Sequence, residues 1–376
     1  MSKNIVFFLA FLLAAVVFLA HWWVVGSAVW GDGRFYYSYA RSLVVDGDFD
    51  FSNEMEYFGE PRILTKTGMV ANKYSIGPAI FWLPGFLIAH LLVRGDGYSH
   101  LYQILVGLNS VFWGILGLWL CWRTACRYFS EKNALLATLG IWLATNLFFY
   151  TAVDPINSHP VSFFVASLLA YLIFGDKLRR LEILGLLVGI LGMIRAQDLI
   201  FSLPVGIYLL KKKINIIKTI NFIIFIILGF LPQILIWKYI YGEFASPYLL
   251  GGEKFNWQNP QIFGILFGQN NGLFYYSPIL LFALLGFYFL FQKNRLLSLT
   301  GIFLFLAQTY LISSWHIWWG GAAYGGRMFV SLMPFFSLGL AAVLERIRNL
   351  GIKIMILIAF ITINFYSIIK FLLISP

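Results

Sequence analysis

Long apolar stretches recur along the whole chain and are separated by short polar segments. The runs cover residues 4–25, 77–93, 101–122, 134–152, 161–174, 183–195, 198–210, 219–241, 276–291, 296–313, 328–344 and 352–374. Several approach the ~20 residues that a helix needs to cross a bilayer, whereas barrel strands alternate over about ten residues. The pattern therefore predicts an all-α, polytopic integral membrane protein.

Composition supports this class. Of the 376 residues, 60% are hydrophobic and 11% are charged, and the mean hydropathy is +0.80. Soluble domains are about 45–50% apolar and about 25% charged. We treat residues 1–376 as a single membrane-embedded domain. Residues 4–25 are expected to be a retained first helix and not a cleaved signal peptide, because the run has spanning length and ends at Trp22 and Trp23.

The charges of the loops indicate how the chain is threaded. The loop 123–133 carries three basic residues and should be cytoplasmic. If Lys3 is also cytoplasmic, the loop 26–76 lies outside. If 77–93 and 101–122 both crossed the membrane, the loop 123–133 would lie outside as well, against the indication of its charges. The run 77–93 is short and contains two prolines, so we predict a juxtamembrane or re-entrant helix there. About eleven transmembrane helices remain, with further helices in the extracytoplasmic loops.

In this topology the inner side holds 16 of the 27 basic residues but only four of the 16 acidic ones. The basic residues are Lys3, Arg123, Arg127, Lys132, Lys177, Arg179, Arg180, Lys211, Lys212, Lys213, Lys218, Lys293, Arg295, Arg346, Arg348 and Lys353. We therefore expect the protein to lie in the inner or plasma membrane of the cell, with its N-terminus in the cytoplasm. We therefore attribute the net charge of +11 to the basic loops on the cytoplasmic side. The sequence contains no basic stripe with interleaved aromatic residues that would indicate a nucleic-acid partner.

Polar chemistry concentrates in the predicted extracytoplasmic loops, above all in 26–76, 242–275 and 313–327. In the first of these, Asp32 stands between two glycines that permit a tight turn. Residues 34–45 predict a short amphipathic helix lying on the bilayer. Asp32 is therefore either a general base at the membrane interface or the N-cap of this helix. The acids that follow, Asp46, Asp48, Asp50, Glu54 and Glu56, are expected to form a solvated face or turn.

Two short outer segments carry further candidates. Asp154 and His159 form either a cap and an interfacial imidazole, or part of a metal or phosphate site beside Asp32. Arg195 stands between two apolar runs, where it either binds a phosphate or pairs with Asp198. No cofactor is assigned by the residues themselves, and a divalent metal ion stays open.

The stretch 313–328 combines four glycines, three tryptophans and Arg327. Paired glycines permit a close approach of the backbone to a ligand, indole faces suit a sugar ring or a prenyl chain, and Arg327 would hold a phosphate. The alternative is an aromatic belt at the membrane surface. Lys73 is a further cationic candidate in the first loop.

Six motifs together resemble the C superfamily of glycosyltransferases (GT-C), in its protein-mannosyltransferase and aminoarabinose-transferase branch. They are Gly31-Asp-Gly-Arg-Phe-Tyr-Tyr37, Lys73-Tyr-Ser-Ile-Gly-Pro78, Asn157-Ser-His-Pro160, Ile194-Arg-Ala-Gln197, Gly272-Leu-Phe-Tyr-Tyr-Ser-Pro278, and Trp318-Trp-Gly-Gly321 with Gly326-Arg327. The resemblance implies an enzyme that transfers a sugar from a polyprenyl-phosphate-linked donor, with inversion, to a hydroxyl of a glycolipid, glycan or protein acceptor. The partners it implies are that donor, membrane lipid and the acceptor.

The resemblance also implies roles for individual residues. Asp32 would take the proton of the acceptor hydroxyl, and Arg195, Arg327 and Lys73 would hold the lipid phosphate. Gln197, His316 and Trp319 are further substrate-binding candidates, and Asp154 and His159 would shape the pocket or bind a metal. The rival hypotheses are a lipid or sugar transporter or flippase, and a non-catalytic membrane assembly protein. A transporter predicts charges at the middle of several spans, whereas here the polar groups gather on one side.

Overall fold

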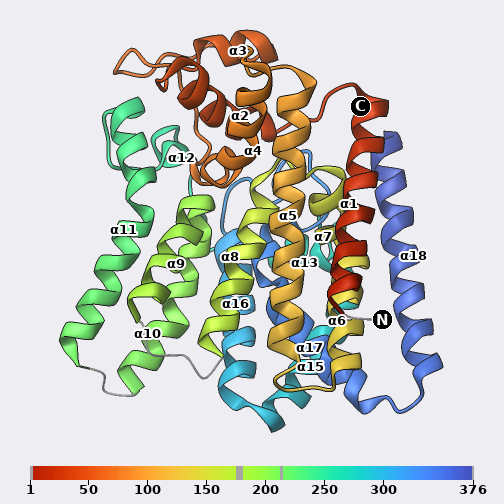
Figure 1. Ribbon diagram of the computed structural model, residues 1–376. Coiled ribbons are helices and arrows are strands. Elements are labelled where there is room, and N and C mark those ends of the chain that lie inside the picture. Colours follow the sequence, from red (N-terminus) through yellow and green to blue (C-terminus); the bar gives the residue numbers. More distant parts are fainter. Residues whose placement is uncertain (1–2, 175–180, 212–214, 375–376) are drawn as a thin grey trace.

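The computed structural model describes residues 3–174, 181–211 and 215–374 as a bundle of helices (Figure 1). Apart from two isolated β-bridges, the regular secondary structure of these residues is helical. The predicted all-α polytopic fold is confirmed. The predicted inner-loop positions Lys177, Arg179, Arg180, Lys212 and Lys213 lie outside the described residues.

Six segments among the described residues are long and apolar enough to cross a membrane. They are α1 (Lys3–Val25), α5 (His100–Ala125), α11 (Ile216–Tyr241), α16 (Arg295–Ser313), η4 (Arg327–Leu332) continued by α17 (Met333–Arg346), and α18 (Leu350–Ile374). A seventh is bent by 73° and comprises α6 (Glu131–Leu143), α7 (Asn146–Phe148) and η2 (Phe149–Val153).

Shorter apolar helices occupy the other predicted runs. These are α8 (Ser158–Ile173), α9 (Leu181–Ile194), η3 (Ala196–Phe201) followed by α10 (Ser202–Lys211), and α15 (Ile279–Lys293). Each of the eleven predicted spanning runs thus corresponds to one helix or to two or three consecutive helices. The number that cross the bilayer stays a prediction.

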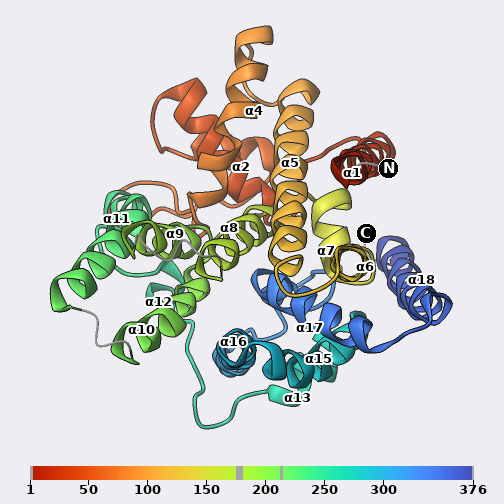
Figure 2. The ribbon, with the colours of Figure 1, turned by 60° about the horizontal axis from the view of Figure 1, so that its bottom comes forward.

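One end of the bundle is covered by short helices from the predicted outer loops (Figure 1). They include α2 (Gly33–Arg41), η1 (Ser42–Asp46), α3 (Ser52–Phe58) and α12 (Pro247–Leu250). Two further short helices, α13 (Ile262–Phe267) and α14 (Leu273–Tyr276), follow later in the chain. Helix α4 (Gly77–Val93) stays at this end and does not extend to the opposite one (Figures 1 and 2). This placement is the one expected of a helix that does not cross.

Glycines let several helices approach closely. A Cβ atom at Gly189 of α9 would lie 2.2 Å from the carbonyl oxygen of Ile226 in α11, and one at Gly286 of α15 would lie 1.8 Å from that of Gly339 in α17. Small residues at helix interfaces are the usual basis of packing in membranes, where burial from water does not drive association between helices. These contacts set the positions of the loops that the helices carry.

The first loop is folded and not simply solvated. Glu54 of α3 is fully buried and lies 3.0 Å from the guanidinium of Arg41, which also pairs with Asp46. Burial raises the pKa of Glu54 to about 7, against the opposing effect of Arg41. The expectation of a solvated acidic face is therefore wrong for Glu54, because α3 turns this side chain inward onto α2.

Candidate active site

Asp32 lies at the turn between α1 and α2, flanked by two positions that favour glycine, Gly31 for its backbone conformation and Gly33 for lack of space. Gly31 adopts a φ of +53°, and a Cβ atom at Gly33 would lie 2.4 Å from the carbonyl oxygen of Ile156. Asp32 occupies the N-cap position of α2, but its side chain makes no capping hydrogen bond. The N-cap interpretation of this carboxylate is wrong.

The carboxylate of Asp32 instead binds two distant side chains. Its Oδ2 pairs with Nη1 of Arg327 at 2.6 Å, although the two residues are 295 positions apart in the chain. Its Oδ1 accepts a hydrogen bond of 2.8 Å from the hydroxyl of Tyr74. Burial raises the pKa of Asp32, but the Arg327 guanidinium and the Tyr74 hydroxyl outweigh it, so the pKa lies below the usual range. Asp32 is therefore ionised at neutral pH.

The glycine-rich loop before η4 positions Arg327 next to Asp32. Three glycines of this loop, Gly320, Gly321 and Gly325, have positive φ angles that a β-carbon would disfavour. The loop turns back on itself, so that Nη2 of Arg327 donates to the carbonyl oxygen of Gly320 at 2.7 Å. Its Nε is buried and has no hydrogen-bond partner among the described residues.

Arg195 lies at the break between α9 and η3, beside the same loop. It donates to Nδ1 of His159, and to the carbonyl oxygen of Arg327 at 3.3 Å. No carboxylate lies within 4.0 Å of Arg195 in the described part of the chain. The alternative of an ion pair with Asp198 is not realised, because hydroxyl groups of Ser162 and Ser331 bind that carboxylate instead, at 2.8 Å each. Among the described residues Arg195 therefore makes no direct ion pair, and Asp198 acts on it only through space.

Gln197 lies two residues after Arg195 and contacts the same loop. Its amide donates to the carbonyl oxygen of Met328 at 2.8 Å, and Nη2 of Arg195 lies 2.6 Å from the sulfur of that residue. Both side chains thus bind the residue that follows Arg327. Gln197 positions the arginine-bearing segment in this structure.

The bend between α6 and η2 directs the next segment toward Asp32. Asn157, and not Asp154, caps α8 by accepting a hydrogen bond from the backbone of Ser158 at 2.7 Å. Asp154 accepts one hydrogen bond of 3.2 Å from the amide of Asn157, while its Oδ1 is buried and unpartnered in the described structure. Burial raises the pKa of Asp154 to about 7. This carboxyl group can therefore gain or lose a proton near neutral pH.

His159 is 2% exposed, so its imidazole is enclosed by protein. Because Arg195 can only donate, Nδ1 of His159 must accept, which places the ring proton of a neutral imidazole on Nε2. The described residues contain no group of three or more His, Cys, Asp or Glu side chains that could hold a metal ion. Asp154 and His159 thus do not fit the metal site that was one alternative for this pair.

A small cavity of about 40 Å³ lies where these segments meet. It is lined by Trp30, Gly31, Asp32, Phe149, Tyr150, Asp154, Asn157, Ala322, Ala323, Tyr324, Arg327 and Phe371. This volume is large enough for water molecules but not for a sugar ring. Binding of a larger ligand at Asp32 therefore requires the surrounding segments to separate.

Six of the nine candidate residues do not line this cavity: Lys73, His159, Arg195, Gln197, His316 and Trp319. Lys73 is half-exposed, 3.6 Å from a carboxylate oxygen of Glu253 and stacked on the ring of Tyr248. His316 and Trp319 are exposed, and the glycine-rich loop lines the cavity with Ala322, Ala323 and Tyr324 instead.

Sequence reasoning missed three polar residues of the site: Tyr74, Tyr150 and Asn157. Tyr74 and Asn157 stand within the quoted motifs, so their positions were signalled although their contacts were not. No motif includes Tyr150, whose hydroxyl donates to the carbonyl oxygen of Tyr324 at 3.1 Å.

Fold and site together define a polytopic membrane protein with a carboxylate–guanidinium centre at one end of its bundle. The fold is similar to that of ArnT from Cupriavidus metallidurans, a structure solved with undecaprenyl phosphate bound. The TM-score is 0.58 at 14% sequence identity, and the likeness covers 94% of this chain and 63% of ArnT. This likeness confirms the ArnT-like polytopic membrane fold, and at 14% identity it concerns the fold alone. No protein-family model and no curated protein sequence matches the chain.

Proposed function

We propose that this protein is a glycosyltransferase that uses a polyprenyl-phosphate-linked sugar as donor and a hydroxyl group as acceptor. One observation carries the proposal: an ionised carboxylate, Asp32, pairs with Arg327 beside a second arginine, Arg195, that makes no direct ion pair among the described residues. Guanidinium groups match phosphate oxygens in a two-point geometry. The site thus offers a base for the acceptor and cations for the leaving phosphate.

The reaction is a single displacement at the anomeric carbon of the donor. The acceptor oxygen forms a bond to that carbon, the bond between the carbon and the phosphate oxygen breaks, and the polyprenyl phosphate leaves with the electron pair. Configuration at the carbon is inverted. Asp32 receives the proton of the acceptor hydroxyl, a contribution that is typically 10²–10⁴-fold in rate. Arg195 and Arg327 stabilise the phosphate in a site with little water.

The ion pair between Asp32 and Arg327 implies that donor binding comes before proton transfer to Asp32. A donor phosphate that binds Arg327 competes with Asp32 for the guanidinium. Once the pair is broken, the carboxylate loses the cation that holds down its pKa and becomes a stronger base. Donor binding thus prepares Asp32 for the acceptor. Asp154, whose pKa is about 7, is positioned in the cavity to bind a hydroxyl of the sugar or acceptor.

The test is direct assay of the purified full-length protein in lipid nanodiscs. A panel of undecaprenyl-phosphate-linked hexoses and pentoses is supplied with lipid and glycan acceptors, and mass spectrometry follows release of undecaprenyl phosphate and formation of product. Wild type should consume one donor, and Arg195→Gln should lose this activity. The matched control is Arg62→Gln, which breaks an exposed ion pair with Glu56. Equal turnover by Arg195→Gln and wild type, or no turnover with any donor, would contradict the proposal.

The orientation of the site is tested separately. We propose that the Asp32 end faces the extracytoplasmic side. Ser99 is exposed just before α5 at this end. A Ser99→Cys variant, with Cys121 and Cys126 replaced, should react with an impermeant maleimide in intact cells. Labelling only after the cells are opened would reverse the topology.

A further inference from the structure

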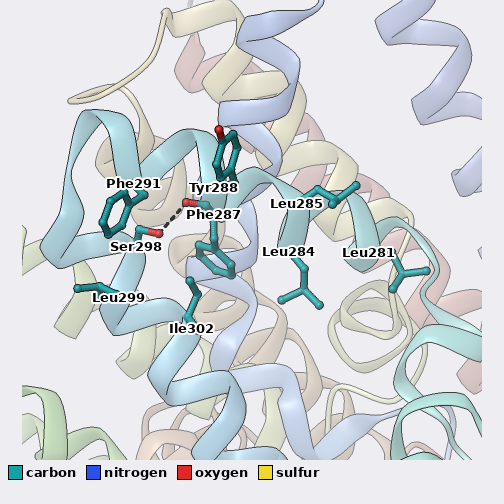
Figure 3. A pocket seen from close by; sticks show the side chains of 9 residues that line it. All are labelled: Leu281, Leu284, Leu285, Phe287, Tyr288, Phe291, Ser298, Leu299 and Ile302. Carbon is teal, nitrogen blue, oxygen red and sulfur yellow. Dashed lines mark hydrogen bonds between the residues drawn. The ribbon is translucent and has the colours of Figure 1, made fainter.

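A second hollow lies on the surface of the bundle, where α15 turns into α16 (Figure 3). It has a volume of about 720 Å³, against about 40 Å³ for the cavity at Asp32. The lining residues are Leu281, Leu284, Leu285, Phe287, Tyr288, Phe291, Ser298, Leu299 and Ile302. We call it the α15–α16 groove. The hydroxyl of Ser298 donates to the carbonyl oxygen of Phe287 at 2.7 Å, so this hydroxyl is already satisfied.

The groove runs along one face of α15. Residues 281, 284, 285, 288 and 291 recur at the spacing of a single helical face. Ten residues at 1.5 Å each give a length of roughly 15 Å, about half of the ~30 Å hydrocarbon core. The ring of Phe287 closes the floor of the groove. It packs against Gly301, where a Cβ atom would lie 2.6 Å from the ring. The groove therefore has the length of one leaflet.

The end of the groove at the α15–α16 turn is rich in positive charge. The guanidinium of Arg295 lies 5.4 Å from the ring centre of Phe291, which is itself a lining residue. Lys293 and Arg346 belong to the same region, bound to the carbonyl oxygen of Tyr128 and the side chain of Gln292. None of the three bases pairs with a carboxylate within 4.0 Å in the described structure.

We propose that the α15–α16 groove is a binding site for an anionic phospholipid. One acyl chain lies in the groove, and the phosphate of the headgroup binds Arg295 at the turn. The site is distinct from the centre at Asp32, because the turn lies at the opposite end of the bundle from α2 (Figure 1). Its ligand is a lipid of the leaflet that the positively charged loops face, and the proposal does not depend on the proposed reaction.

Two features separate this site from the general coat of lipid on a membrane protein. Exposed apolar residues also cover α11 and α18, but at the α15–α16 turn the apolar side chains enclose a hollow of about 720 Å³ next to Arg295. Charge complementarity then selects the headgroup, because a basic residue near an anionic bilayer surface favours binding by an amount worth about fivefold in affinity. A second copy of the chain fits less well, since Arg295, Lys293 and Arg346 would face the same cations across a symmetric interface.

The test is native mass spectrometry of the delipidated full-length protein titrated with phosphatidylglycerol or with phosphatidylcholine of the same chains. Wild type should retain one phosphatidylglycerol in preference to phosphatidylcholine. Arg295→Gln should weaken phosphatidylglycerol about fivefold and remove the preference. The control Arg123→Gln removes an exposed base from the end of α5, where the groove does not lie, and should leave binding unchanged.

A second pair of variants tests the apolar part. Leu285→Trp fills the groove from a residue that is 65% exposed, and should weaken both lipids. Ile224→Trp, on the exposed face of α11, should not. Equal binding of the two lipids by wild type, or equal loss in Arg295→Gln and Arg123→Gln, would overturn the proposal. Cross-linking of two chains through α15 in nanodiscs would assign the groove to a dimer interface instead.

Discussion

Replacement of Asp32 by asparagine should separate donor binding from catalysis, with opposite effects on the two. In the wild-type structure Asp32 and Arg327 are joined at 2.6 Å, with side chains only 24% and 14% exposed. A donor phosphate must displace this carboxylate before it can use Arg327. The uncharged amide of Asp32→Asn competes less well, so undecaprenyl phosphate should bind more tightly to the variant.

The size of the effect follows from the contact that is lost. A hydrogen bond to a charged group contributes about 1.5–3 kcal/mol, and the asparagine oxygen retains part of it. A net release of ~1.4 kcal/mol corresponds to about tenfold tighter binding of the lipid phosphate. Turnover should fall by about 10²–10⁴-fold in the same variant, because the base is gone.

Two measurements on one preparation check this prediction. Affinity for undecaprenyl phosphate is measured by titration in nanodiscs, and turnover by release of the lipid phosphate from the active donor. Glu60→Gln is the control, because it breaks a 2.7 Å pair with Arg34 in the same loop but outside the cavity. Weaker lipid binding by Asp32→Asn, or unchanged turnover, would refute the competition between carboxylate and phosphate.

Three other substitutions probe the same site. Arg195→Lys keeps the charge but loses the planar fork, so lipid-phosphate affinity should fall about tenfold in the same titration. Tyr74→Phe removes a hydrogen bond that lowers the pKa of Asp32. Because the ionised carboxylate is lost as pH falls through its pKa, the acid limb of the pH–rate profile should move to higher pH. Gly33→Ala should lower stability by about 1–3 kcal/mol and reduce turnover, since its Cβ atom would meet the carbonyl oxygen of Ile156; thermal unfolding with an activity assay measures both.

The helices of this protein could be predicted from the sequence because a membrane span is a local property. A run such as 101–122 is apolar over the full thickness of the bilayer, and its backbone can satisfy its hydrogen bonds only as a helix. The placement of 77–93 could also be predicted. Its prolines, its short length and the charges of the loops indicated a helix confined to one end. The short helix after Asp32 was visible from its aromatic periodicity.

The candidate residues could be named in advance but not their partners. Asp32, Arg195 and Arg327 were conspicuous because charged groups next to apolar runs are costly and rarely incidental. Whether Asp32 capped a helix, and whether Arg195 paired with Asp198, were questions of distance. The first was decided by Arg327 and Tyr74, and the second by the hydroxyl groups that surround Asp198.

The sequence by itself determined the class of the protein, the helical runs and the end of the bundle at which the polar groups gather. Only the tertiary structure decided which of those groups meet, as with Asp32 and Arg327, and which do not, as with His316. The physical reason is that hydrophobic length and charge act locally along the chain. The distance between two loops depends instead on how closely the helices pack, which contacts such as that of Gly286 with Gly339 set across the whole fold.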